Sequence, residues 1–216
     1  PAQWYQTKTQ HEIDRLKALG LQDDTFIPVN ELENRRFSAK TNYLNINLNA
    51  RIKIMDGLTA SIRYQTEQTN GFTKQYDSKD AIEVKTMINN ATQMTNGIPK
   101  HNVPLGGQVV QRNIDNFSYT FRAQADYNKI VNNNVIQFLA GAEVRKVVTS
   151  GNGFYRLGYD DNNLGYSEID ALSMSKMLSG TESLYGTFSF SNKTPATTYA
   201  DNRYLSFYAN GSYTIN

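Results

Sequence analysis

Few residues in this chain have the chemical types that catalysis or metal binding requires. The sequence contains two histidines, His11 and His101, and no cysteine. The lack of cysteine excludes disulfides, thiolate metal sites and cysteine nucleophiles. Neither histidine has a serine or carboxylate pattern around it that would suit a general base. We therefore expect both to be solvated side chains outside the strands, and we expect neither an enzyme nor a bound cofactor or metal.

One acidic segment contains oxygen ligands of the kind that calcium prefers. It reads Asp160-Asp161-Asn162-Asn163. Its surroundings do not fit the EF-hand loop, which needs a glutamate at its twelfth position. We interpret this segment as an acidic turn.

The composition and hydropathy of the chain argue against nucleic-acid binding and against a transmembrane helix. The net charge of the 216 residues is +2, which predicts no strong attraction to nucleic acid. The sequence has no apolar run of the roughly 18 residues that indicates a transmembrane helix. The chain starts at Pro1 rather than Met and stops at Asn216 within an alternating pattern. We expect it to be a fragment of a longer protein.

The strongest structural signal in the sequence is an alternation between residues 44 and 64. Apolar residues occupy every second position and polar residues lie between them, which predicts a β-strand with one apolar face. Met55-Asp56-Gly57 interrupts the pattern and suits a hairpin turn, because glycine adopts the left-handed conformation. Pairing Ile54 with Leu58 places the whole apolar set on one face. That set is Leu44, Ile46, Leu48, Ala50, Ile52, Ile54, Leu58, Ala60, Ile62 and Tyr64.

The length of this alternation bears on the environment of the strand. Residues 44–54 extend roughly 36 Å at about 3.3 Å per residue. With a tilt of about 40° the strand spans about 28 Å, close to the apolar band of an outer-membrane barrel. A soluble β-protein also accommodates such a strand, so the pattern alone leaves both classes open.

A second hairpin and a final strand repeat the pattern. The strands are expected at about 43–55, 58–67, 115–128, 135–147 and 203–215, with Tyr127 opposite Ile136 in the second hairpin. Both faces of the last strand carry aromatic residues, so its lipid-facing side is not assigned. Residues 1–42 are expected to be a loop region with a short helix, about 10–19, that begins with a Thr9–Glu12 capping box.

Two long polar segments, 68–113 and 148–202, separate the predicted strands. Loops of this length are rare in compact soluble domains but usual on the extracellular side of outer-membrane barrels. Short turns at one end and long loops at the other therefore favour the membrane class.

Several segments resemble the SusC/RagA family of TonB-linked outer-membrane transporters of Bacteroidetes. They are NYLNINLNARIKIMDGLTASIRYQTE (42–67), FSYTFRAQADYNKIVNNNVIQFLAGAEVR (117–145), FYRLGYDDNNLGY (154–166) and DNRYLSFYANGSYTIN (201–216). The resemblance implies an all-β fold, an antiparallel transmembrane barrel of about 22 strands with long extracellular loops. It also implies a plug, a SusD-like surface lipoprotein partner and TonB-driven uptake of glycans or peptides. This chain would be an internal segment of that barrel.

If the apolar residues face lipid, a set of polar residues faces the lumen. They line the solute path or simply solvate the barrel wall: Asn47, Asn49, Arg51, Arg63, Arg122 and Gln124. Three tyrosines of the second long segment, Tyr155, Tyr159 and Tyr166, either contact a solute or lid protein or pack within the loop.

The leading hypothesis is part of a TonB-dependent importer of oligosaccharides or peptides in the outer membrane of a Gram-negative bacterium. The alternative is a soluble β-rich carbohydrate-binding or adhesion module. The face formed by Leu44, Ile46 and Leu48 discriminates between them, because it meets lipid in the first case and a second sheet in the other.

Overall fold

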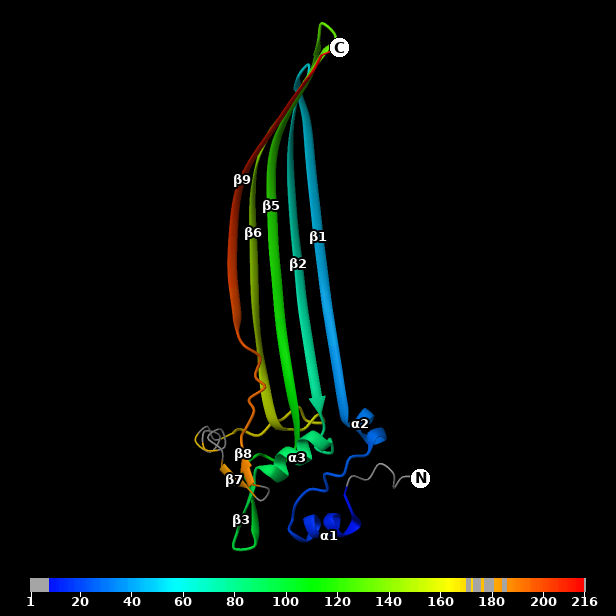
Figure 1. The fold of residues 1–216 in the computed structure, drawn as a ribbon, viewed down its shortest axis with the longest axis vertical. Helices are drawn as coiled ribbons and strands as arrows, with labels where there is room; N and C mark the ends of the chain where they lie inside the picture. The colour runs from blue at the N-terminus through cyan, green and yellow to red at the C-terminus, as the bar shows by residue number, and fades with distance from the viewer. Residues whose placement is uncertain (1–7, 170–171, 173–175, 177–180, 184–185, 216) are drawn as a thin grey trace. The chain divides into compact units, whose positions relative to one another are not determined.

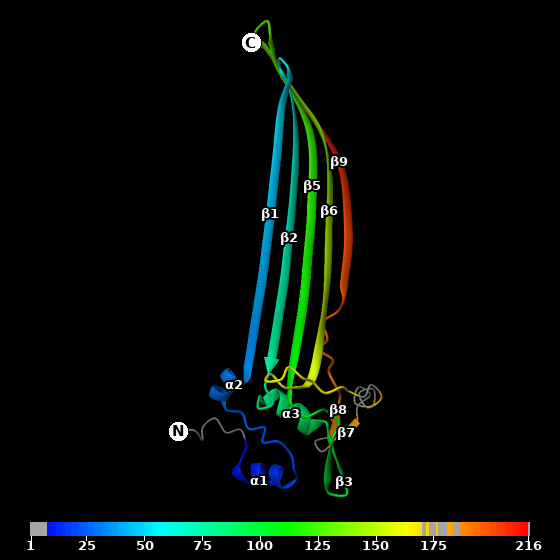
Figure 2. The same ribbon diagram turned by 180° about the vertical axis from the view of Figure 1, so that it is seen from behind.

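The long strands form one open sheet. The computed structural model describes residues 8–169, 172, 176, 181–183 and 186–215, and in this part of the chain the sheet has the order β1-β2-β5-β6-β9. Figures 1 and 2 show these strands side by side from opposite sides. Their bounds are β1 Arg35–Met55, β2 Leu58–Asp77, β5 Gly107–Val131, β6 Asn134–Tyr159 and β9 Thr198–Thr214. Mostly antiparallel strands and few helices agree with the all-β class.

The remaining elements are short. The helices are α1 Gln10–Ala18, α2 Pro28–Asn34 and α3 Ile82–Asn90, and two small sheets pair β3 Thr92–Thr95 with β4 Ile98–His101 and β7 Thr181–Ser183 with β8 Gly186–Phe188. The capping box expected at Thr9 and Glu12 is present at the start of α1. None of the helices in the described residues is both long and apolar enough to cross a membrane.

The chain divides into two compact units, which we call the loop unit and the sheet unit. The loop unit comprises Pro1–Ala39, Thr73–Arg112 and Gly153–Ala196, and the sheet unit comprises Lys40–Phe72, Asn113–Asn152 and Thr197–Asn216. The long strands contribute residues to both units, so each unit is described separately below.

The strands extend well beyond the ranges expected from alternation. Strand β2 continues to Asp77 and β5 begins at Gly107, within the segment expected to be a loop. Asn70-Gly71, which resembles a turn, lies inside β2; a Cβ on Gly71 would come within 2.9 Å of the Ile114 side chain. This glycine therefore permits a close approach between strands. Alternation did not reveal these extensions because they lack the apolar face that gives the period-2 signal.

The β5–β6 hairpin has a shorter turn than the sequence suggests. Strand β5 ends at Val131 and β6 begins at Asn134, so only Asn132 and Asn133 connect them. Their φ angles are 48° and 67°. Positive φ at both central residues is typical of the type I′ turn, which matches the twist of paired strands and suits asparagine.

This turn shifts the expected pairing of β5 with β6. Arg122 Nε donates to Glu143 Oε2 at 2.8 Å, and Thr149 Oγ1 donates to Asn116 Oδ1 at 2.8 Å. Both pairs lie two residues away from the pairing that puts Tyr127 opposite Ile136. A shift of two keeps every side chain on its face, whereas a shift of one would exchange the faces.

The register of β6 with β9 assigns the faces of the last strand. Val144 pairs with Leu205, and Ala142 pairs with Phe207. Directly opposite residues in a ladder share a face. Leu205 and Phe207 therefore lie on the apolar face of β6, and Tyr204 and Tyr208 lie on the polar face.

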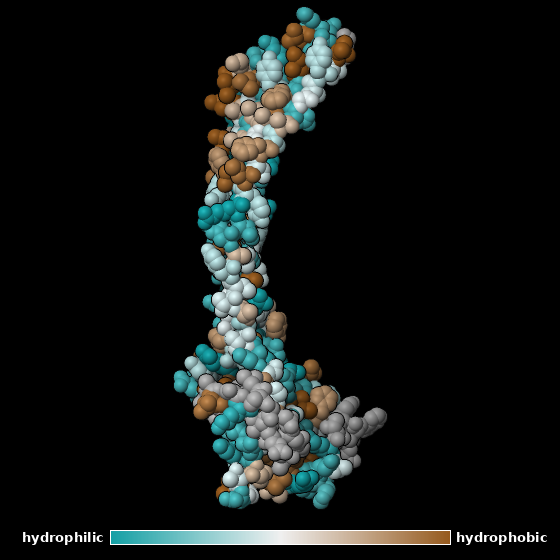
Figure 3. All heavy atoms as spheres, turned by 60° about the vertical axis from the view of Figure 1, so that its left-hand side comes forward, coloured by the Kyte–Doolittle hydropathy of each residue, from teal (hydrophilic) through white to brown (hydrophobic). Residues whose placement is uncertain are grey.

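Many large side chains on the apolar face of the sheet unit are exposed. Twelve of them retain between 41% and 76% of their accessible surface. Figure 3 shows apolar side chains, in brown, gathered over this part of the strands. The exposed set comprises Leu44, Ile46, Leu48, Ile52, Ile54, Ile62, Phe117, Phe121, Phe138, Val144, Leu205 and Phe207.

The loop unit, in contrast, has a buried hydrophobic core. Helix α3 contributes Val84 and Ile88, which lie one helical turn apart, and β6 contributes Leu157. The core cluster comprises Ala81, Val84, Ile88, Ala91, Val103, Tyr155, Leu157 and Phe190. Segments expected to be loops are thus tied together by apolar packing.

Shortening Leu157 tests this core. Leu157 retains 1% of its accessible surface, so Leu157→Ala is expected to destabilise the loop unit by about 2–5 kcal/mol through lost contacts and a residual cavity. Leu105 is 54% exposed, and Leu105→Ala serves as the control, with an expected change within about 0.5 kcal/mol. Tryptic cleavage of the full-length protein across a urea series measures both. Equal effects of the two substitutions would contradict the core assignment.

Candidate functional site

The polar face of the sheet unit carries all six lumen-facing candidates. Asn47, Asn49 and Arg51 lie on β1, Arg63 on β2, and Arg122 and Gln124 on β5. Across β1 and β2, Asn45 Nδ2 donates to Glu67 Oε1 at 2.9 Å; within β1, Asn47 Nδ2 donates to Asn45 Oδ1. Pairing Ile54 with Leu58 places Asn45 opposite Glu67, so this contact supports the expected register of the first hairpin.

A cluster of four side chains brings two of these candidates together. The Arg122–Glu143 pair lies beside Tyr208, whose ring centroid is 5.6 Å from Arg122 Cζ. The Tyr208 hydroxyl donates to Gln124 Oε1 at 2.9 Å, and Gln124 Nε2 donates to Asp126 Oδ1 at 2.7 Å. We call Arg122, Gln124, Glu143 and Tyr208 the wall cluster.

The wall cluster includes two residues that sequence reasoning missed, Glu143 and Tyr208. Tyr208 pairs with Gly141, and a Cβ on Gly141 would collide with the Tyr208 ring. The glycine therefore provides the space over which the ring lies, an arrangement that stabilises glycines in strands. An isolated glycine inside an alternating strand is the signal that predicts such a close approach.

The wall cluster combines four kinds of hydrogen-bonding group. A guanidinium, a carboxylate, an amide and a phenol together offer donors and acceptors to a polar solute. The other four candidates lie outside the cluster, on β1 and β2: Asn47, Asn49, Arg51 and Arg63. Within the described ranges, no group of three histidine, cysteine, aspartate or glutamate side chains is placed to hold a metal ion.

The segment at residues 160–163 forms a turn. Asn162 N donates to the Asp160 side chain at 3.0 Å. Asp161 pairs with two cations, Arg36 at 2.6 Å and Lys74 at 3.4 Å. These contacts agree with the interpretation as an acidic turn.

The expectation that both histidines are solvated and outside the strands is wrong for His101. It lies partly buried on β4, and its Nδ1 lies 2.8 Å from Thr92 Oγ1 across the β3–β4 pair. His11 lies exposed on α1.

Two of the three candidate tyrosines are buried on a strand. Tyr155 and Tyr159 retain 7% and 8% of their accessible surface and belong to β6, not to a loop. Tyr155 stacks on Phe190 with ring centroids 6.2 Å apart, and Tyr159 accepts a hydrogen bond from Lys74 Nζ at 3.2 Å. Burial favours packing over contact with a solute or lid for both residues.

Tyr166 is the exposed member of the set. It retains 49% of its accessible surface, and Arg156 Cζ lies 4.6 Å from its ring centroid. A cation over an aromatic face is a weak but directional contact. Of the three tyrosines, Tyr166 alone is presented to solvent.

A polar network that begins at Tyr155 links several strands of the loop unit. The Tyr155 hydroxyl donates to Gln108 Oε1 at 2.7 Å, and Gln108 Nε2 donates to Asp77 Oδ2 at 2.6 Å. Arg35 Nε donates to the other oxygen of Asp77 at 3.0 Å. Burial, followed by the charges of Glu83 and Asp77, raises the pKa of Tyr155, so its hydroxyl stays protonated as a donor.

The network ends at Glu83 on α3, which forms ion pairs with Arg35 and Lys193. Burial acts to raise the pKa of Glu83, but the hydrogen bond and charge of Lys193 and the charge of Arg35 outweigh it. The pKa of Glu83 is therefore lowered, and its carboxylate is favoured by folding.

Comparison with solved structures shows similarity in fold. A chain of the RagAB peptide importer in its "open-open" state matches with a TM-score of 0.57 and 21% identity, covering 88% of this chain and 17% of that one. The "closed-closed" state gives a TM-score of 0.58 and 20% identity, covering 89% and 18%. A third structure, of the RagAB peptide transporter, gives 0.56 and 20%, covering 84% and 16%.

The similarity covers only a small part of the transporter chains. The chain spans 16% to 18% of the length of the transporter chains it matches. No family model and no curated protein matches the sequence. The similarity therefore concerns the strand arrangement of one segment.

The lowered pKa of Glu83 predicts a pH-dependent stability of α3. A carboxylate with a depressed pKa stabilises the folded state above its unfolded pKa, near the ordinary value of 4.5, and loses that contribution as pH falls through the folded pKa. Glu83→Gln is expected to reduce amide protection in α3 above pH 4.5 and to differ less from the unsubstituted protein below it.

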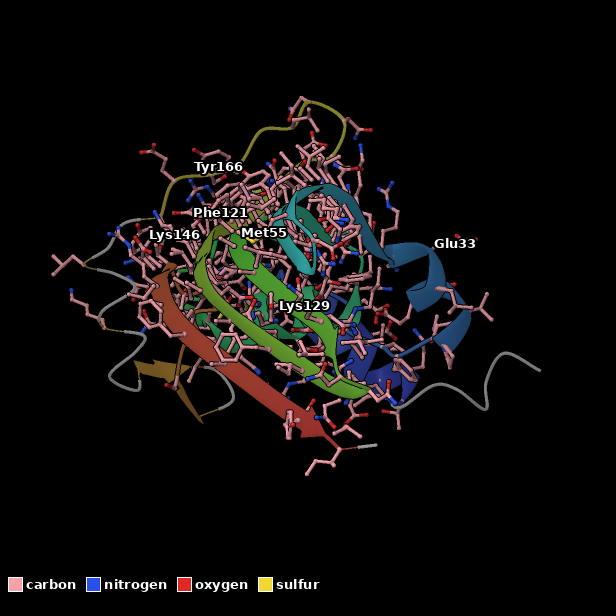
Figure 4. All side chains as sticks on the ribbon, turned by 90° about the horizontal axis from the view of Figure 1, so that it is seen from above. Glu33, Met55, Phe121, Lys129, Lys146 and Tyr166 are labelled. Atoms are coloured by element: carbon pink, nitrogen blue, oxygen red, sulfur yellow. The ribbon has the colours of Figure 1, made fainter. Side chains whose placement is uncertain are left out.

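Hydrogen exchange of the full-length protein, corrected for intrinsic rates at each pH, measures this difference. Exposed Glu33 of α2, labelled in Figure 4, provides the control Glu33→Gln. A Glu83→Gln effect that is constant across the pH range would contradict the ion-pair explanation.

Proposed function

We propose that this chain is a segment of the wall of a transmembrane β-barrel in the outer membrane of a Gram-negative bacterium. The parent protein is a TonB-dependent importer of the SusC/RagA family. It moves a solute through the barrel without breaking a bond, so this segment acts by lining and enclosing the path.

The observation that carries the proposal is the exposed apolar face of the sheet unit. Leu48, Ile52 and Phe207 keep 61%, 66% and 76% of their accessible surface although they belong to one continuous face. Soluble monomers rarely expose apolar patches larger than a few hundred Å². Contact with lipid acyl chains stabilises such a face, because it removes the apolar side chains from water.

The dimensions of the face agree with a bilayer. The apolar runs, residues 44–54 on β1, 117–127 on β5 and 136–144 on β6, have the about 9–11 residues that a tilted transmembrane strand needs. Each run alternates with polar residues on the other face, the pattern of barrels with a wet interior.

The wall cluster suits the wet side of this barrel. Its charged groups are paired, Arg122 with Glu143, so the cluster offers hydrogen bonds without a net charge of its own. Such a surface solvates the barrel wall and lets polar solutes exchange hydrogen bonds as they pass. Asn47, Asn49, Arg51 and Arg63 extend the same face.

The substrate class and partners of the parent protein follow from family resemblance. The solute is an oligosaccharide or a peptide, and similarity to a peptide importer supports the second. A SusD-like surface lipoprotein covers the extracellular opening. TonB engages parts of the parent protein outside this segment.

Locating the full-length parent protein tests the proposal against a soluble carbohydrate-binding or adhesion module. Inner and outer membranes are separated, and extraction is attempted with and without detergent. We expect a heat-modifiable band in the outer-membrane fraction that needs detergent. Recovery as a soluble monomer would rule out the importer and favour the soluble module.

A pair of neighbouring substitutions tests which face meets lipid. Leu48→Arg puts a charge near the middle of the apolar run, where about 2–4 kcal/mol is expected to be lost from membrane folding. Asn49→Arg places the same charge one residue away on the polar face, where it is tolerated. The fraction of heat-modifiable protein in outer membranes measures both. Equal assembly of the two variants would show that the face does not contact lipid.

A further inference from the structure

On β6 and β9 the run of apolar cross-strand pairs is interrupted by charge. Val144 pairs with Leu205, and the next pair on the same face is Lys146 with Arg203. Two residues advance a strand by about 7 Å, so the two cations lie just past the Val144–Leu205 pair. In Figure 4, which looks along the strands, Phe121 of the apolar face and Lys146 lie on the same side of the sheet.

Two like charges placed directly opposite each other destabilise a ladder. A single carboxylate, Asp201, compensates both: its Oδ2 lies 3.5 Å from Lys146 Nζ and 2.9 Å from Arg203 Nη2. Arg203 Nε donates to the other oxygen of Asp201 at 3.3 Å. The three residues together keep one net positive charge.

The geometry leaves donors available at this site. The Arg203 side chain is 72% exposed, whereas Lys146 and Asp201 are 27% and 19% exposed. Asp201 is thus the least exposed of the three residues, and Arg203 the most exposed. A guanidinium has five N–H donors in a planar fork, and Asp201 occupies the Nε and one Nη2 donor.

The neighbouring aromatic residue indicates an interfacial position. Tyr199, on the same face of β9 as Asp201 and Arg203, is 74% exposed. Exposed tyrosines next to an apolar band are typical of the level of lipid headgroups. The order along β9 is thus tyrosine, charged pair, then apolar residues.

We propose that Lys146 and Arg203, positioned by Asp201, bind the phosphate of an anionic lipid headgroup at the edge of the membrane-facing surface. A phosphate offsets the uncompensated charge of the Lys146–Arg203 pair and accepts the free donors of the guanidinium. The acyl chains of the bound lipid then lie along Val144, Leu205 and Phe207. This inference rests on the proposed function, because it requires the apolar face to meet lipid.

The test uses the full-length protein in nanodiscs made of phosphatidylcholine with a minor fraction of phosphatidylglycerol. Lipids retained after mild detergent extraction are counted by native mass spectrometry. The unsubstituted protein is expected to retain phosphatidylglycerol in excess of its share of the bilayer.

The double substitution Lys146→Gln with Arg203→Gln should reduce this enrichment by roughly fivefold per cation removed, which corresponds to about 1 kcal/mol per basic residue near an anionic surface. The matched control, Lys53→Gln with Arg145→Gln, removes the same charge from the polar face and should retain the enrichment.

The outcomes separate the two proposals. Failure to enter nanodiscs of phosphatidylcholine alone would overturn the proposed function. Entry without enrichment of phosphatidylglycerol, or equal loss in the double variant and the control, would overturn the headgroup site while leaving the barrel segment intact.

Discussion

The structure depends on the register of its backbone ladder. Because side chains alternate between faces, a slip of one residue in any strand would carry its apolar side chains to the polar face. The pairing of Val144 with Leu205 and of Gly141 with Tyr208 fixes both faces of β6 and β9 at once. The exposed apolar face, the wall cluster and the Lys146–Arg203 pair are consequences of this one constraint.

The same strands therefore present a polar surface on one face and an apolar surface on the other. On one, Gly141 leaves room for the Tyr208 ring, which orders Arg122 and Gln124 through a cation–π contact and a hydrogen bond. On the other face, the apolar residues of β6 are followed by a charged residue, Lys146. Neither face needs a second sheet if one meets lipid and the other meets water, which is how a barrel wall differs from a sandwich.

The loop unit shows a different balance of forces. Its strands have no continuous apolar face, and buried groups such as Leu157 and Tyr155 hold them to α3. The polar chain from Tyr155 through Gln108 to Asp77 joins residues far apart in sequence. Such contacts leave no local signature, and this is why the sequence predicts a loop here and leaves the role of its tyrosines open between contact with a solute or lid protein and packing.

The sequence by itself determined the first hairpin, the existence of the second, the alternation that gives each strand an apolar face, and the capping box of α1, because these signals come from residues close together in the chain. The register of the second hairpin came only from the structure. Tertiary structure decided how far the strands extend, which face of β9 is apolar, and that Tyr155 and Tyr159 are buried while Tyr166 is exposed. It also decided that Tyr208 joins Arg122. These features arise from pairing and packing between distant segments, whose energies a local pattern does not contain.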